Sequence, residues 1–266
     1  MSTLVIAISD RISRRFGNLF RMFGGAWLLF VQSCRDLFTR PRYPRLVIDQ
    51  LYSIGVESSA LLLVTAGFSG MVMALQFGLG LEKFGGKLYV PKIVSLSIVR
   101  EISPVFCSLM FAARVGAGIA SEIASMVVTQ QIDAIRVLGT SPIKRIVIPR
   151  ILACLIALPL LCVLGNFVGI IGAGIVGVTE LGLDATFFYQ KVLETVSLVD
   201  FLTGFLKTFF FALFISLTAC HFGLTVQGGT QGVGRATTLA VVISSISVLI
   251  SDYFLTKLFY VLLEKP

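Results

Sequence analysis

The amino-acid sequence predicts an all-α integral membrane protein. Of its 266 residues, 56% are hydrophobic and only 14% are charged, whereas soluble domains carry about 25% charged residues. Five segments are apolar enough to cross a bilayer, because a helical span needs about 20 such residues. Segments of this length satisfy their own backbone hydrogen bonds as helices. So few charged residues could not cover the surface of a soluble fold of this size.

A basic amphipathic helix is predicted over about residues 10–40, ahead of the spans. Its apolar residues recur at helical spacing: Ile12, Phe16, Leu19, Phe20, Phe23 and Trp27. Four arginines lie mainly on the other side of this helix: Arg11, Arg14, Arg15 and Arg21. A helix of this pattern is suited to lie in the interface of an anionic leaflet.

The five spans form one predicted transmembrane core over about residues 50–262, and the whole chain, 1–266, is expected to be a single domain. The predicted spans are 50–77, 92–115, 146–178, 201–224 and 237–262. The third is longer than a bilayer requires, so it is tilted or projects beyond the membrane. A small-residue stripe along it indicates close packing against another helix, within the chain or in a dimer: Gly165, Gly169, Ala173 and Gly177.

The distribution of Lys and Arg predicts the orientation. Residues 1–50 hold eight basic residues, which places the N-terminus in the cytoplasm. The segment 114–150 holds five and lies on the same side after two crossings. The segment 179–200 is then an external loop. The external loop 78–92 is an exception to the excess of basic residues on the cytoplasmic side, because it carries three lysines. Five crossings leave the C-terminus outside.

Cysteine and histidine usage argues against several kinds of site. The five cysteines occur singly, mostly within apolar runs, which is typical of small buried residues: Cys34, Cys107, Cys154, Cys162 and Cys220. His221 is the only histidine, so a His-based metal site or a Ser-His-Asp triad within one chain is effectively excluded. No metal and no cofactor is expected.

Ionisable residues interrupt the predicted spans. Arg100 and Glu101 lie in the second, Lys207 in the fourth and Asp252 in the fifth, and Glu57 begins the first. A charge at the bilayer centre costs about 2.5–3.5 kcal/mol on insertion scales, so such residues face a partner or an aqueous cavity. Two interpretations stay open. The residues form structural ion pairs, Arg100 with Glu101 and Lys207 with Asp252, or they converge on one outward-facing site for an anionic headgroup beside acyl chains.

The chain shows no nucleotide site of its own. A phosphate-binding loop needs the pattern GxxxxGK[ST]. The stretch GLGLEKFGGKL has Leu81 where the first glycine belongs, and Leu88 follows the lysine. The stretch GGTQGVGRATT, residues 228–238, contains no lysine and is predicted to be a tight loop. If the protein pumps a substrate, another chain hydrolyses the ATP.

A short polar segment, 128–145, separates the second and third spans. Four apolar residues line one face of a predicted helix: Val128, Ile132, Ile135 and Leu138. Gly139 is a natural helix stop and Pro142 follows soon after. A cytoplasmic helix of this kind is suited to docking a soluble partner, and an interfacial helix without a partner is the alternative.

Motifs in this region and beyond resemble those of known transporters. The stretch DAIRVLG…IVIP resembles the EAA loop of ABC importer permeases through Asp133, Ala134, Gly139, Ile146 and Pro149, with Asp in place of the usual Glu and Ile135 in place of the second Ala. Residues 99–150 and 232–256 are similar to the MlaE/YrbE permease family. The motifs carrying this resemblance are REISPV, ARVGA, SEIASM, PIKR and RATT.

The resemblance implies a homodimeric ABC-transporter permease that moves phospholipids or related lipids between the inner membrane and the periplasmic side. It implies three kinds of partner chain, with no nucleic acid: an ABC ATPase (MlaF-like), which binds the ATP, a periplasmic MCE-domain protein (MlaD-like), and a STAS-domain subunit (MlaB-like) as an optional third. The expected location is the bacterial inner membrane, with the plastid inner envelope as the less favoured choice.

The resemblance also implies two sets of site residues. The lipid cavity is expected to include Arg100, Glu101, Ile102, Lys207 and Asp252. The coupling helix that seats on the ATPase is expected to include Glu122, Asp133, Ile135, Arg136, Leu138 and Gly139.

Two other classes of membrane protein are the alternatives to a permease. A lipid-modifying membrane enzyme lacks a plausible catalytic set, and a stand-alone ion-coupled carrier is supported only by the intramembrane charges.

Overall fold

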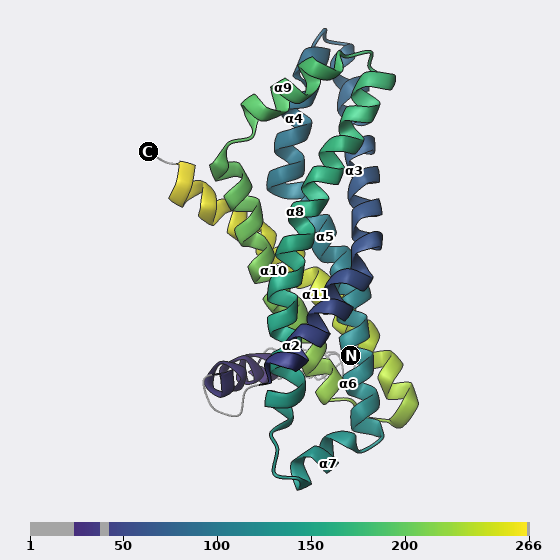
Figure 1. Ribbon diagram of the computed structural model, residues 1–266, viewed down its shortest axis with the longest axis vertical. Helices are drawn as coiled ribbons and strands as arrows, with labels where there is room; N and C mark the ends of the chain where they lie inside the picture. Colours follow the sequence, from purple (N-terminus) through teal and green to yellow (C-terminus); the bar gives the residue numbers. More distant parts are fainter. Residues whose placement is uncertain (1–23, 38–42, 265–266) are drawn as a thin grey trace, which may run out of the picture.

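The computed structural model describes residues 24–37 and 43–264, and the regular elements in these ranges are all helices. They form an elongated bundle that is drawn upright in Figure 1. Five helical units are long and apolar enough to cross a membrane: Pro44–Glu82, Lys87–Val128, Ile143–Thr179, Leu198–Leu224 and Gly229–Leu262. The five predicted spans are therefore confirmed. The first three run past both predicted limits, while the fourth and fifth begin earlier than predicted and end at the predicted residues.

The first two spans are helices with short breaks in their hydrogen-bonding pattern. The first span consists of α2 (Pro44–Leu51), a π-helical turn η1 (Tyr52–Val56) and α3 (Glu57–Glu82). The second consists, in order, of the 3₁₀ turn η2 (Lys87–Tyr89), α4 (Val90–Ser97), the π turn η3 (Ile98–Ile102), α5 (Ser103–Phe111), the π turn η4 (Ala112–Gly116) and α6 (Ala117–Val128). π turns inside helices are rare and occur frequently at functional sites.

The remaining elements follow in chain order. They are α7 (Gln131–Val137), the π turn η5 (Ile143–Val147), α8 (Ile148–Thr179), α9 (Ala185–Thr195), α10 (Leu198–Leu224), α11 (Gly229–Phe259) and the π turn η6 (Tyr260–Glu264). Because α7 lies between the second and third spans, the short helix predicted in 128–145 is present. It is shorter than predicted, since Val128 ends α6 instead.

The segment predicted as an external loop, 179–200, contains a helix. The Asp184 carboxylate caps α9 by accepting a hydrogen bond from the Phe187 amide at 2.8 Å. Phe188 and Val192 are buried on its inner face, and α9 lies beside α4 and α8 at the upper end of Figure 1. A helix of eleven residues is too short to register as a span, so apolar length alone could not reveal it.

The tight loop predicted for 228–238 is wrong beyond its first two residues. Gly228 and Gly229 have positive φ of 90° and 64°, and they turn the chain into α11. The helix then runs through the remaining glycines. Gly232 is there because a side chain at this position would collide with the Gln227 carbonyl. The glycines of this stretch therefore serve close packing as well as a turn.

The small-residue stripe of the third span packs within the chain. A β-carbon on Gly70 of α3 would collide with the Gly169 carbonyl of α8, and one on Gly172 would meet the Gly67 carbonyl. The backbones of α3 and α8 can approach this closely only because these residues carry no side chain. Further up, Gly177 leaves room for the ring of Phe188.

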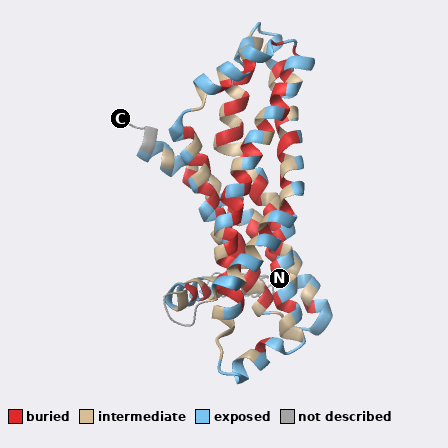
Figure 2. Ribbon diagram, viewed as in Figure 1, coloured by how far each residue is buried: buried red, intermediate tan, exposed pale blue. Residues whose placement is uncertain are grey.

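The third span is the centre of the bundle. In its most apolar window 72% of the residues are buried, against 28% in the first span and 22% in the fifth. Figure 2 shows the same contrast as a band of buried residues along the middle of the molecule. Phe111, Leu158, Phe211 and Ile215 fill the core beside α8. The first and fifth spans are therefore the most open to lipid or to another subunit.

Most of the predicted N-terminal amphipathic helix lies outside the described residues, including Ile12, Phe16, Leu19, Phe20 and Phe23. The described part, 24–37, is helical and lies across the lower end of the spans in Figure 1. One side is exposed, with Trp27 and Leu28 at 64% and 61%, while Leu29 is buried. A helix is present in this part, while its amphipathic character over 10–40 and its place in a membrane interface remain predictions.

Candidate functional site

The second span is interrupted where Arg100 and Glu101 occur. The Ser103 amide donates to the Ile98 carbonyl, five residues back, which is the π-helical pattern of η3. Pro104 follows and has no N–H, so it cannot donate to the carbonyl of Arg100 as an α-helical residue would. On α10, Gly204 lacks the side chain that would collide with the Val99 carbonyl. The break therefore leaves a backbone carbonyl available at the point where α10 comes closest.

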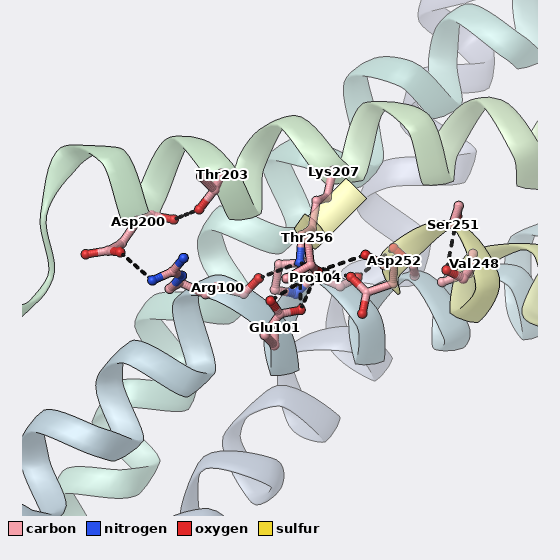
Figure 3. Close-up of polar contacts among 11 residues, drawn as sticks. Arg100, Glu101, Pro104, Asp200, Thr203, Lys207, Val248, Ser251, Asp252 and Thr256 are labelled. Carbon is pink, nitrogen blue, oxygen red and sulfur yellow. Dashed lines mark hydrogen bonds and ion pairs between the residues drawn. The ribbon is translucent and has the colours of Figure 1, made fainter. Parts of the chain in front are cut away.

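Lys207 of α10 uses that carbonyl and three side-chain oxygens (Figure 3). Its ammonium group donates to the carboxylates of Glu101 at 2.6 Å and Asp252 at 3.0 Å. It also donates to the Thr256 hydroxyl at 2.7 Å and the Arg100 carbonyl at 3.3 Å. The Lys207 side chain is 1% exposed. One cation thus joins the second, fourth and fifth spans at a single level.

Arg100 points to a different partner. Its guanidinium lies 3.4 Å from the carboxylate of Asp200, at the beginning of α10. Asp200 also closes a capping box with Ser197, accepting from the Ser197 hydroxyl at 2.7 Å and from its amide at 3.0 Å. The capping box fixes the carboxylate in place. The second and fourth spans are therefore joined by two ionic contacts, both drawn in Figure 3.

The four charged residues expected to converge do lie together. Of the ion pairs considered from the sequence, Lys207 with Asp252 is present. Glu101 also pairs with Lys207, and Arg100 pairs with Asp200, which the sequence reasoning assigned to the external loop. Two features of the sequence could have identified the other partners of Lys207, which are the Thr256 hydroxyl and the Arg100 carbonyl. Thr256 lies four residues after Asp252 on one helical face, and Pro104 lies four after Arg100.

Burial determines what each charge can do. Desolvated charges are stable only when they are paired and hydrogen-bonded, which Lys207 is. It is therefore not available in this conformation to bind an anionic headgroup directly. Glu101 is 37% exposed, Arg100 24% and Asp252 21%. Glu101 is therefore the most accessible charge of the cluster, while Arg100 and Asp252 are shielded to a similar degree.

Ile102 ends the same π turn and lines a narrow slot between the first, second and third spans. Ala66, Phe106 and Gly165 also line it. Its volume is about 10 Å³, close to the ~10–15 Å³ that one water molecule needs. The single chain therefore offers no room for an acyl chain in this slot.

At the opposite end of the second span, α7 projects from the bundle (Figure 1). Gln130 and Gly139 bound it with positive φ of 60° and 71°, which confirms Gly139 as a helix stop. Val137 and Leu138 are 87% and 75% exposed, while Ile132 is buried. Leu138 and Ile132, which were predicted to share one helical face, therefore differ in exposure, and the apolar surface that remains open at the end of α7 is formed by Val137 and Leu138. The bend at Gln130 rotates α7 away from the register of α6.

The remaining predicted coupling residues take different positions. Asp133 and Arg136 pair with each other at 3.0 Å, and both side chains are 64% exposed. Ile135 is half-buried. Glu122 lies on α6, not on the short helix, and its carboxylate accepts from the Arg150 guanidinium at 2.7 Å. Glu122 therefore belongs to a different helix from the other residues predicted for the coupling helix.

The pair of Glu122 and Arg150 braces the connection that carries α7. Arg150 lies near the start of α8, is 8% exposed, and also donates to the Ile146 carbonyl at 3.3 Å. The pair joins the helix that precedes α7 to the helix that follows it. The two helices that flank α7 are therefore tied to each other by an ion pair.

Comparison with known proteins agrees with this architecture. The model of the family described as Permease MlaE matches residues 47–258. A probable ABC transporter permease protein of Rickettsia felis is 38% identical over 97% of this chain and 99% of its own. The intermembrane phospholipid transport system permease protein MlaE of Haemophilus influenzae is 31% identical over the same shares. The chloroplastic protein TRIGALACTOSYLDIACYLGLYCEROL 1 of Arabidopsis thaliana is 32% identical over 81% of this chain and 62% of its own. The chain is a multi-pass membrane protein that belongs to the MlaE permease family.

Proposed function

We propose that this protein is the membrane-spanning subunit of an ABC transporter that moves phospholipids between the bacterial inner membrane and the periplasmic side. The observation that carries this proposal is the end-to-end likeness to the Haemophilus influenzae permease, whose name states intermembrane phospholipid transport. The N-terminus and α7 then face the cytoplasm, and the C-terminus faces outward. The excess of basic residues in 1–50 supports this orientation.

ATP binding and hydrolysis belong to a separate ABC ATPase chain in this proposal. The exposed end of α7, formed by Val137 and Leu138, is an apolar tip on a cytoplasmic helix, and the charged pair Asp133–Arg136 lies beside it. Apolar anchors with a polar rim are typical of protein interfaces. Ile135 and Gly139 adjoin this tip, while Glu122 lies on α6 and is held by Arg150.

A second copy of this chain would complete the lipid cavity. The slot beside Ile102 is too small for an acyl chain, whereas large apolar residues of the first and fifth spans are exposed along their lengths, among them Phe68, Val72, Ile246 and Tyr253. Two copies facing each other through these spans would enclose apolar space next to Glu101. We further propose that an MCE-domain protein binds the periplasmic face. A STAS-domain subunit is an optional further partner on the cytoplasmic side.

Within this cavity the charged cluster has two kinds of members. Arg100, Glu101 and Ile102, the more accessible ones, border the lipid. Lys207 and Asp252 hold η3 in its π-helical form and so determine where Glu101 points. The cluster is therefore a wall of the cavity with a polar edge, and Lys207 positions its neighbours without binding lipid itself.

Charge reversal at Glu101 tests the assignment of the cavity. We expect Glu101→Lys to reduce the phospholipid that co-purifies with the protein, measured by mass spectrometry, while a tagged ATPase subunit still co-purifies. Glu82→Lys is the matched control, because Glu82 is exposed at the end of the first span and pairs only with Lys87 among the described residues. Unchanged lipid occupancy in Glu101→Lys would defeat the assignment.

The intramembrane charges favour one other function, transport coupled to an ion gradient. The two functions differ in their energy source. In proteoliposomes containing the permease and its ATPase, we expect lipid movement to require ATP and to be insensitive to a proton gradient. Movement driven by a proton gradient alone, in a protein that purifies without any ATPase, would favour the carrier and contradict our proposal.

A further inference from the structure

A second polar site lies near the cytoplasmic end of the bundle, between the first and second spans. Gln50, Ser53 and Glu57 line it from α2, η1 and α3, and Arg114 and Glu122 line it from η4 and α6. Its volume is about 130 Å³, roughly ten times the ~10–15 Å³ that holds one water molecule. The pocket therefore has room for a ligand group larger than a bound water.

The charges in this pocket are incompletely paired. Arg114 is exposed and has no hydrogen-bond or ion-pair partner among the residues that the structure describes. Glu57 accepts a hydrogen bond only from the Ser53 hydroxyl, at 3.2 Å, within the same part of the chain. Glu122 is held by Arg150 but stays 61% exposed. The pocket thus holds one guanidinium, which has five donors, and two carboxylates that have acceptor positions left over.

The depth of the pocket matches a headgroup layer. Tyr52, 62% exposed, lies between Gln50 and Ser53 in sequence, and the helix 24–37, which carries the 64% exposed Trp27, lies at the same end of the bundle as α2. Exposed Tyr and Trp gather at the level of the headgroups in membrane proteins. Arg114 is fourteen positions beyond Arg100 on the second span, which is about 21 Å along a helix. The two polar sites therefore lie at different depths of the membrane.

We propose that this pocket binds the headgroup of a zwitterionic phospholipid of the cytoplasmic leaflet, with the phosphate on Arg114 and a primary ammonium on Glu57. A guanidinium at the membrane surface is suited to a phosphate, because charge-assisted hydrogen bonds to phosphate are strong. The two carboxylates repel a purely anionic headgroup and attract an ammonium group. This inference rests on the proposed phospholipid function, because it assigns that lipid a second location.

A second copy of the chain is the competing occupant. It is disfavoured by shape, because a copy related by a two-fold axis through this patch would present the same hollow to itself. A lipid headgroup, in contrast, fills a hollow and leaves its acyl chains along the exposed side of the first span. Val56 and Leu61 are exposed there, 57% and 43%, so apolar surface for these chains adjoins the pocket.

The test measures retained lipid by class. The purified protein is incubated with equal amounts of phosphatidylethanolamine and phosphatidylglycerol of identical acyl chains, and native mass spectrometry counts each lipid bound. We expect the parent to prefer phosphatidylethanolamine. Arg114→Gln should weaken retention of one lipid about tenfold, the scale expected for a lost charge-assisted hydrogen bond. Glu57→Gln should keep a lipid but shift the preference toward phosphatidylglycerol.

Arg235→Gln is the matched control, since Arg235 is an exposed arginine near the start of α11 and does not line the pocket. Two results would overturn the inference. They are equal retention of both lipids by the parent, and retention in Arg114→Gln and Glu57→Gln that matches the parent. If Glu101→Lys still loses lipid in these cases, only this inference fails and the proposed function stands.

Discussion

At the scale of single residues, Lys207 is the charge whose surroundings are most fully specified. A lysine that is almost completely buried needs acceptors, and it receives two carboxylates, a hydroxyl and a backbone carbonyl. The carbonyl is free because Pro104 cannot donate to it. A proline, often described as a helix breaker, thus provides one of the ligands of a buried cation. The stability of this arrangement depends on all its members being present.

Removal of Lys207 should therefore be costly. Lys207→Met leaves two carboxylates without a counter-charge, and breaking a buried pair in this way costs about 3–5 kcal/mol. We expect a lower midpoint of thermal unfolding in detergent. Combining it with Glu101→Gln and Asp252→Asn should recover much of the loss, because no charge is then left unpaired. A triple variant no more stable than Lys207→Met would contradict this account.

Lys191 provides the control for this prediction. It pairs with Glu194 at 2.7 Å on the surface of α9, where both side chains are well exposed. Exposed pairs contribute little to stability. Lys191→Met should leave the unfolding midpoint close to that of the parent.

At the scale of elements, the bundle depends on how closely helix backbones approach each other. The hydrophobic effect does not drive helices together within a lipid bilayer, so van der Waals packing between small residues takes over this role. Here the first span packs against the third through Gly67, Gly70, Gly169 and Gly172. The same device brings α10 against the π turn η3 at Gly204, which places Lys207 within reach of its partners.

Two glycines of α3 should respond in opposite ways to alanine. Gly70→Ala would place a β-carbon against the Gly169 carbonyl, and overpacking of this kind costs about 1–3 kcal/mol. Gly80→Ala meets nothing within 4 Å and should stabilise the helix by about 0.5–1 kcal/mol through its better propensity. Thermal unfolding in detergent distinguishes them. Equal midpoints for both variants would show that α3 and α8 do not approach as described.

At the scale of the whole molecule, the two halves of the second span carry different features. Its first half carries η3 and the accessible edge of the charged cluster, and α7 follows its other end. The Glu122–Arg150 pair ties that end to α8, the most buried helix, which in turn packs on α3. Packed helices thus connect the ends of α7 with the first and third spans, and a contiguous connection of this kind is what the proposed action of a partner at α7 would need.

Changes at the tip of α7 should separate docking from lipid binding. We expect Leu138→Asp to weaken ATPase binding about thirtyfold, because burying a charge at an apolar anchor costs about 2 kcal/mol. Arg136→Glu should loosen the ATPase less. Neither variant should empty the cavity, which lies far away. Binding is measured by titration with purified ATPase. Leu193→Asp on α9, where Leu193 is 81% exposed, is the control at the other end, and an equal loss there would refute a specific docking site.

Apolar length and charge placement in the sequence alone determined the fold class, the five spans and the presence of a short helix between the second and third. These features follow from local physics, because each span satisfies its own backbone and must be apolar over the thickness of the bilayer. The same reasoning identified Arg100, Glu101, Lys207 and Asp252, since a charge inside an apolar run is visible without any structure.

Only the tertiary structure decided how those charges pair and which of them remain accessible. The ion pair of Arg100 with Asp200, the burial of Lys207 and the location of Glu122 on α6 all depend on how helices rotate and approach. A π turn shifts the register of every residue after it, and glycines set the distance between neighbouring backbones. Neither effect is encoded in hydrophobic periodicity, because both arise from contacts between segments that are far apart in the chain.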